Sequence, residues 1–109
     1  MDNESAKPKR LVQFGNLASQ DFSDNYDHSA FHWGIDQAER YSKFLQDAAA
    51  RAAEYPESGK KVENYPEFRA IFVKWPKSKY GHFLIYRIIP EGIYVLRILH
   101  SAMNVQDHL

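Results

Sequence analysis

The sequence contains no cysteine, no long apolar run and no excess of charge of either sign. Without cysteine, the chain has neither disulfides nor thiolate metal ligands. No apolar stretch approaches the roughly 18 residues needed to span a bilayer, and the N-terminal MDNESAKPKR lacks the apolar core of a signal peptide. We therefore expect a soluble, cytoplasmic protein that has no membrane partner.

The charges of the chain cancel, but they are unevenly distributed. Residues 1–59 hold six Lys/Arg against ten Asp/Glu, and residues 60–109 hold eight against four, so the two parts carry −4 and +4. A net charge of zero argues against a protein that is held on nucleic acid by phosphate attraction alone. The separation of charge can orient a partner protein, or it can be a solvated pattern without a role.

The first half of the chain predicts a strand followed by two helices. We expect residues 1–9 to be a disordered lead-in and residues 10–109 to form a single domain, as the length of 109 residues suggests. Residues 10–15 alternate as a short strand that ends at Gly-Asn. One amphipathic helix is predicted from Ala18 to a break near Gly34 and a second from about Ile35 to Glu54, and together they should form a hairpin.

The second half predicts a sheet. Residues 60–67 have the composition of a charged connection, and strands are predicted over 68–75, 82–89 and 93–100. The fold class is therefore α+β: an N-terminal strand, an antiparallel helical hairpin and a three-stranded antiparallel C-terminal sheet, in the order β-α-α-β-β-β. Pro90-Glu91-Gly92 suits a three-residue hairpin with Gly92 at positive φ, which pairs Ile89 with Ile93.

In that register both faces of the predicted sheet are mainly apolar. Two helices can cover one face, so the face carrying Arg87 and Arg97 is expected to be an exposed partner site. The alternative is that the sheet curls and that the N-terminal strand and the loops hide this face.

Two histidines have the spacing of metal ligands. His28 and His32 lie four residues apart on the first predicted helix, but no second His pair and no cysteine completes a site. We expect surface histidines, no metal and no cofactor.

Taken in order, these segments resemble the RelE/ParE superfamily of toxins from type II toxin–antitoxin systems, and the chain is nearer to the ParE branch. The resemblance spans nearly the whole chain. Its most specific pieces are Ala18–Tyr26, the helix with Ala38 and Phe44-Leu45, Tyr55–Gly59, Phe83–Arg87 and Arg97–His100.

The RelE-like members of this superfamily are ribosome-dependent mRNA endonucleases that use clustered Lys/Arg, with Tyr or His in some. Aligned to that pattern, the chain keeps a basic residue at Arg69, but other basic positions fall on Ile71, Phe83 and 101–103. The resemblance implies that an endonuclease would use a divergent site, with His100 as acid or base. Its residues would be Arg69, Tyr86, Arg97 and His100.

The ParE-like members bind DNA gyrase and poison it. The ending Arg97-Ile-Leu-His100 is similar to that branch, although the Arg-Asp that usually follows is absent from residues 101–107. The resemblance implies a toxin that inhibits DNA gyrase by noncovalent binding and is neutralised by a cognate antitoxin. The alternatives are an endonuclease acting on ribosome and mRNA, and a toxin fold that only binds a partner, so whether the chain is an enzyme stays open. The expected partner contacts are Arg69, Lys74, Trp75, Lys77, Lys79, Tyr80, Arg87, Arg97 and His100.

Overall fold

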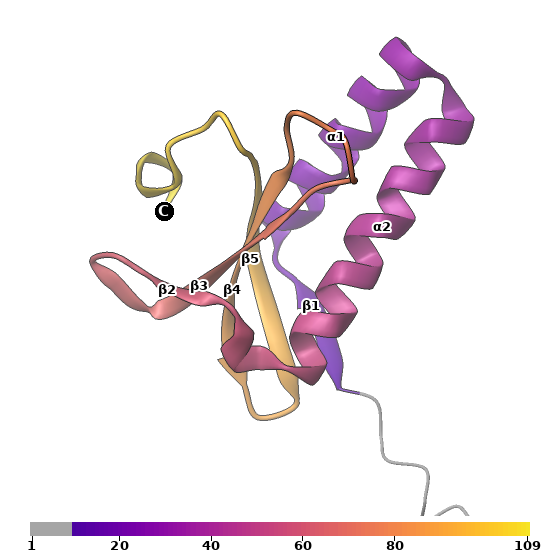
Figure 1. Ribbon diagram of the computed structural model, residues 1–109. Helices are drawn as coiled ribbons and strands as arrows, with labels where there is room; N and C mark the ends of the chain where they lie inside the picture. The colour runs from indigo at the N-terminus through magenta and orange to yellow at the C-terminus, as the bar shows by residue number, and fades with distance from the viewer. Residues whose placement is uncertain (1–9) are drawn as a thin grey trace, which may run out of the picture.

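The computed structural model describes residues 10–109, so the expected disordered lead-in lies outside the described residues. Two long helices are followed by most of the strands, as Figure 1 shows. The described elements are β1 (Leu11–Phe14), α1 (Asn16–Trp33), α2 (Ile35–Glu54), the 3-10 turn η2 (Pro56–Ser58), β2 (Lys60–Val62), β3 (Tyr65–Val73), β4 (His82–Ile89), β5 (Gly92–His100) and the 3-10 turn η3 (Val105–His108).

The sheet is larger than the sequence predicted. The α+β class and the order of the first three elements are confirmed, but the three-stranded antiparallel sheet is wrong. Within residues 10–109 five strands form one mixed sheet in the order β1-β5-β4-β3-β2, with β1 parallel to β5 and the other neighbours antiparallel. The expected charged connection contains β2 and the start of β3, which form a hairpin around Asn64 at φ +70°.

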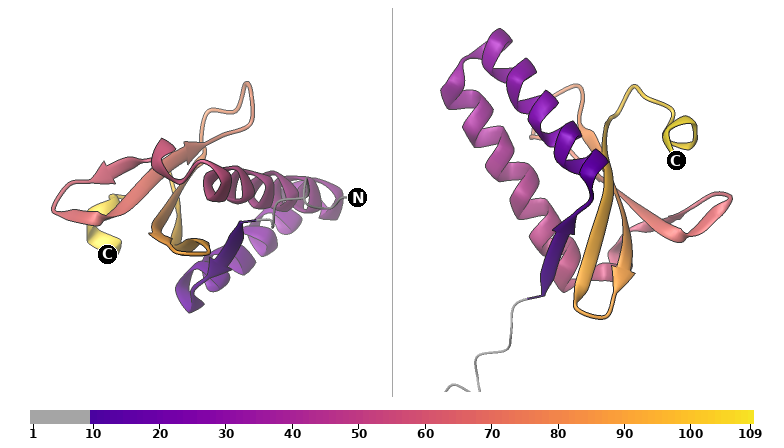
Figure 2. Two further views of the ribbon diagram at one scale, coloured as in Figure 1. Left: turned by 90° about the horizontal axis from the view of Figure 1, so that it is seen from below. Right: turned by 180° about the vertical axis from the view of Figure 1, so that it is seen from behind.

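The helical hairpin covers one face of the sheet. Figure 2 shows both helices on one side, with the β2–β3 hairpin and the C-terminal turn on the other. Alanines of α2 are almost completely buried there and pack with Leu84, Tyr86, Ile93 and Val95 of the sheet. Small side chains let a helix approach its neighbours closely, so the alanine stripe of α2 forms part of the core. No helix among the described residues combines the length and apolar character that a bilayer crossing requires.

Both helix boundaries near Gly34 follow from that residue. Gly34 has φ +95°, a backbone conformation that favours glycine, and its N–H donates to the Ala30 carbonyl at 3.0 Å. The predicted break at Gly34 and the predicted range of α2 are confirmed.

The register of β4 and β5 changes along their length. Near the turn Ile88 pairs with Ile93 and Ile89 with Gly92, whereas farther along Ile85 pairs with Arg97, as predicted. Leu96 is the extra residue of a β-bulge between the two parts. The predicted Ile89–Ile93 pairing and the positive φ at Gly92 are therefore wrong.

The glycine at position 92 is explained by its neighbour strand instead. A Cβ on Gly92 would collide with the backbone of Leu11, so glycine lets β1 lie against β5.

The bulge also changes the second face of the sheet. It turns Ile93 and Val95 toward the helices, where both are buried in the core. On the opposite face Ile85 and Leu99 are 0% and 1% exposed. The C-terminal turn lies on that side, so the expectation of a fully open apolar face is wrong for its centre. Phe72, 47% exposed, and its neighbour Phe83 keep part of the face accessible.

Candidate functional site

Arg69 and Tyr86 hold the turn that follows α2. They are cross-strand neighbours on β3 and β4. The Arg69 guanidinium donates to the carbonyls of Gly59 at 2.7 Å and Glu57 at 3.2 Å. The Tyr86 hydroxyl accepts from the Gly59 N–H at 3.1 Å and donates to the Pro56 carbonyl at 2.8 Å. Tyr86 is 0% exposed. Through these hydrogen bonds both residues anchor the chain between α2 and β2.

Arg97 is joined to α1 through Asp21. Its Nε and Nη2 donate to the two carboxylate oxygens of Asp21 at 2.8 and 2.9 Å, and Nη1 donates to the His108 carbonyl at 3.3 Å. The hydrogen bond to Asp21 is the main cause that raises the pKa of Arg97. The same carboxylate accepts from the Ile98 N–H at 2.9 Å, on the part of β5 that extends beyond β1. Asp21 thus caps the free edge of β5 and orients Arg97.

A cluster of histidine and tyrosine rings lies where β4 begins and β5 ends. His82 and His100 are cross-strand partners whose ring centroids are 5.5 Å apart, and Tyr80 lies 5.4 Å from His100. The Tyr41 hydroxyl of α2 forms a 2.7 Å hydrogen bond with Nδ1 of His82. His100 accepts from the Ala102 N–H at 3.0 Å.

Burial dominates the electrostatics of this cluster. Burial, and to a lesser degree the neighbouring His100, lowers the pKa of His82 to about 4. Burial also raises the pKa of Tyr41 to about 12. Both members of the hydrogen bond are therefore neutral at physiological pH, which is what a bond across a packed interface requires.

The loop between β3 and β4, residues 74–81, displays the basic residues. Lys74, Lys77 and Lys79 are exposed, and none of them forms an ion pair with a residue in the range 10–109. The loop is held by a Ser78 N–H to Trp75 carbonyl bond of 3.1 Å. Lys77 has φ +70° in this turn. This backbone conformation is energetically unfavourable for residues other than Gly or Asn.

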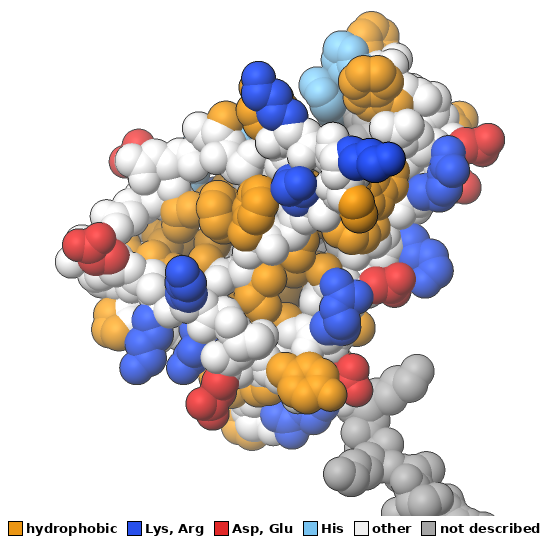
Figure 3. Space-filling view, in the orientation of Figure 1, with side chains coloured by type: hydrophobic (Ala, Val, Ile, Leu, Met, Phe, Trp, Pro, Cys, Tyr) orange, Lys and Arg blue, Asp and Glu red, His pale blue; other side chains and the backbone are white. Residues whose placement is uncertain are grey.

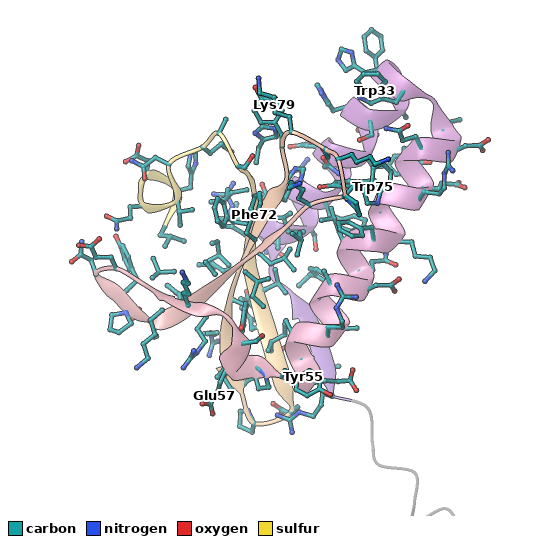
Figure 4. The ribbon with its side chains drawn as sticks, viewed as in Figure 1. Trp33, Tyr55, Glu57, Phe72, Trp75 and Lys79 are labelled. Atoms are coloured by element: carbon teal, nitrogen blue, oxygen red, sulfur yellow. The ribbon has the colours of Figure 1, made fainter. Side chains whose placement is uncertain are left out.

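Trp75 anchors the loop to α2. Its ring lies 4.9 Å from Tyr41 and 6.1 Å from Phe44 between centroids. Figure 4 shows Trp75 between the loop and α2, and Lys79 at the outer end of the loop. Tyr80 is 51% exposed, and Lys79 Nζ lies 5.5 Å from its ring centroid.

The structure brings together only part of the expected set. Tyr80 joins the loop to His100 through a ring contact, whereas Arg87 lies near the β4–β5 turn with its guanidinium 5.0 Å from the Tyr94 ring. Arg69 and Arg97 are engaged in internal bonds at two other places. In the described part of the chain, no three His, Cys, Asp or Glu residues gather as a metal site.

Sequence reasoning missed the end of the helical hairpin. Phe31, Trp33 and Ile35 are 85%, 67% and 61% exposed around Gly34. Figure 3 shows hydrophobic side chains and histidines gathered at this end. The signal was present in Phe31-His-Trp-Gly-Ile35, because a glycine break between two helices sends the adjoining apolar residues away from the packed stripe.

The fold defines a class: a small α+β protein in which a helical hairpin packs on one face of a twisted mixed sheet. A solved chain described as the chromosomal ParDE TA system from P. aeruginosa has the same fold, with a TM-score of 0.66 at 17% identity over 84% of this chain and 95% of that one.

The family follows from the sequence comparisons. Residues 12–105 match the family described as ParE toxin of type II toxin-antitoxin system, parDE. Toxin ParE1 of Mycobacterium tuberculosis is 40% identical over 71% of this chain and 74% of the relative. Toxin ParE1 of Caulobacter vibrioides is 32% identical over 94% of this chain and 98% of the relative. The chain belongs to the ParE toxin family, which confirms the resemblance seen in the sequence.

Proposed function

We propose that this ParE-type toxin inhibits DNA gyrase by noncovalent binding in the cytoplasm and that a cognate antitoxin neutralises it. The proposal is supported mainly by one observation: the side chains that phosphate cleavage would need form hydrogen bonds within the fold. Tyr86 is 0% exposed, Arg69 holds the Gly59 carbonyl and Arg97 holds Asp21. A cleavage site needs donors aimed at the developing charge of the substrate, and these three side chains already have partners.

The remaining candidate acid–base group is isolated from the others. His100 lies beside Tyr80 and His82, and its Nδ1 already accepts the Ala102 N–H. General acid–base chemistry needs groups within hydrogen-bond reach of one substrate. The arrangement therefore favours binding over bond cleavage.

The β3–β4 loop is the surface that we assign to gyrase contact. Lys74, Lys77 and Lys79 are exposed, and Tyr80 offers an exposed aromatic ring beside them. Aromatic and basic side chains carry much of the energy of protein interfaces. Trp75 is half-buried and packs on α2, so its expected role is to hold the loop in place.

Two assays on one preparation of the protein distinguish gyrase inhibition from mRNA cleavage. We expect the purified toxin to inhibit gyrase supercoiling and to leave messages intact on translating ribosomes. Changing Lys74, Lys77 and Lys79 together to Gln should weaken the inhibition, whereas changing Lys60 and Lys61 to Gln on β2 should not. Ribosome-dependent cleavage that disappears in His100→Ala, with supercoiling unaffected, would overturn the proposal.

The antitoxin should cover the accessible part of the second sheet face. Phe72, 47% exposed, packs against Phe83 with ring centroids 5.2 Å apart. Such an apolar patch suits an amphipathic helix or an added strand of a partner. We expect the adjacent small open reading frame to encode a protein that copurifies with the toxin. Phe72→Ser should weaken the complex, and Ile88→Ser, at a residue 41% exposed elsewhere on β4, should not.

A further inference from the structure

The end of the helical hairpin is an apolar surface that the fold leaves without a partner. We call Phe31, Trp33 and Ile35 the hairpin tip. Their exposed fractions are 85%, 67% and 61%, and a Cβ added at Gly34 would meet no atom within 4 Å. Large exposed aromatic and aliphatic side chains in one place mark a protein contact.

The charges nearest the tip are mainly acidic, although Arg40 and Lys43 follow Asp36 and Glu39 along α2. Residues 11–39 contain five Asp/Glu and no Lys/Arg. Asp36 and Glu39 on the first turns of α2 and Asp27 on α1 are exposed near the tip. An apolar centre with a mainly acidic surround fits a basic surface that also offers aromatic rings.

The same chain carries such a surface. Residues 68–90 contain five Lys/Arg and no Asp/Glu. The exposed lysines of the β3–β4 loop and the half-exposed Tyr80 supply both the charge and the aromatic ring.

The tip and the loop lie at one end of the molecule. Figure 4 shows Trp33 at the end of the helical hairpin and Lys79 on the β3–β4 loop, both toward the upper end of the view. An interface about a two-fold axis requires that one surface hold both complementary halves, and this end of the molecule does.

We propose that two copies of this chain associate about a two-fold axis, with the hairpin tip of each copy against the β3–β4 loop of the other. Trp33 and Phe31 would meet lysine stems and Tyr80, and Asp36 and Glu39 would meet the lysine ammonium groups. The net charge of zero removes the general repulsion between copies, while the separated charges favour this orientation.

The dimer goes beyond the proposed function and has its own consequence. It covers the loop that we assign to gyrase contact, so the dimer and the target complex exclude each other. The dimer would then be a storage form that dissociates on dilution or when a partner competes for the loop.

Sedimentation equilibrium tests the proposal on the full chain. We expect a monomer–dimer equilibrium that weakens as salt is raised, because part of the attraction is between exposed charges. Trp33→Ser should weaken the dimer about tenfold or more, as the loss of a central aromatic contact does. Leu17→Ser, at a residue 56% exposed at the other end of α1, is the control and should change nothing.

A charge exchange tests the reciprocal geometry. Reversing Asp36 and Glu39 to Lys in one variant, and Lys77 and Lys79 to Glu in another, should leave each variant monomeric alone. Mixed together they should form a heterodimer, because both tip-to-loop contacts again join opposite charges. Circular dichroism would establish that both variants are folded. A wild-type monomer at all concentrations, or folded variants that do not pair when mixed, would overturn the dimer. Neither result bears on gyrase inhibition, which the supercoiling assay measures separately.

Discussion

Arg69 and Tyr86 hold opposite sides of the same residue, Gly59. The guanidinium donates to its carbonyl at 2.7 Å, and the tyrosine hydroxyl accepts its N–H at 3.1 Å. A Cβ at this position would lie 2.5 Å from the hydroxyl oxygen, which explains the glycine although its φ of −76° is open to any residue. The end of α2 is thereby fixed to the middle of the sheet.

Removing the hydroxyl should destabilise the fold. Tyr86→Phe leaves the Gly59 N–H and the Pro56 carbonyl without their partner, which should lower the free energy of unfolding by about 1 to 3 kcal/mol. Urea denaturation checks this value. Tyr55→Phe is the matched control, because Tyr55 is 68% exposed, and its effect should stay within about 0.5 kcal/mol. Equal effects of the two variants would contradict the role of the clamp.

The ion pair between Arg97 and Asp21 should contribute more than an ordinary surface pair. Their side chains are 16% and 14% exposed, so Arg97→Gln should cost about 2 to 3 kcal/mol by leaving a shielded carboxylate without its cation. Arg97→Lys should restore only part of this lost stability, since an ammonium group cannot bond both carboxylate oxygens of Asp21 as the guanidinium does. The exposed pair of Lys43 and Asp47 is the control, and Lys43→Gln should cost at most about 0.5 kcal/mol. Thermal or urea unfolding of the three variants measures these losses. A loss in Arg97→Gln no larger than the loss in Lys43→Gln would contradict the prediction.

Stability should fall in acid because His82 is held neutral. Its pKa is about 4 in the fold and near 6.5 when unfolded, so the unfolded chain binds the proton first as the pH falls. The contribution of neutral His82 to the free energy of unfolding is fully present above pH 6.5. It is lost between pH 6.5 and 4, and the loss is at most about 3 kcal/mol. Denaturant titrations at several pH values should show a flatter dependence for His82→Gln. The exposed His28→Gln should keep the slope of the wild type, and a slope unchanged in His82→Gln would refute the assignment.

The turn at Lys77 should be open to stabilisation. Its φ of +70° suits Asn better than Lys, so Lys77→Asn should raise the free energy of unfolding by about 0.5 to 1 kcal/mol. Lys79→Asn also removes one positive charge, but Lys79 does not have a positive φ, so this control should not raise the free energy of unfolding. If both variants gained equally, the effect would come from charge and not from the backbone. A more stable but less inhibitory Lys77→Asn would indicate that the lysine is kept for contact.

The elements that the sequence predicted well are those with a local signal. The range of α2 follows from its alanine stripe and from Tyr55-Pro56, and β4 follows from its apolar residues. β2 and the start of β3 were hidden because KKVENYPE is polar and contains Pro66 in a strand. The bulge at Leu96 has no sequence signal of its own, so strand parity assigned Ile93 and Val95 to the wrong face.

Sequence alone can locate only the part of the candidate site that is contiguous along the chain, and its role in binding stays a prediction. The basic loop could be recognised from the alternation of lysine and aromatic residues in 74–80. The roles of Arg69 and Arg97 could not, because their partners are backbone carbonyls and a carboxylate 76 residues away. An arginine alone does not reveal whether it faces a ligand or its own chain.

The parallel pairing of β1 with β5 delays the completion of the fold. The helical hairpin forms from contacts between neighbours in sequence, but β1 finds its partner and Asp21 its arginine only after the intervening helices and strands have been made. Closing such distant contacts slows folding. A freshly made chain therefore passes through a period in which β1 and Asp21 do not yet have their partners on β5.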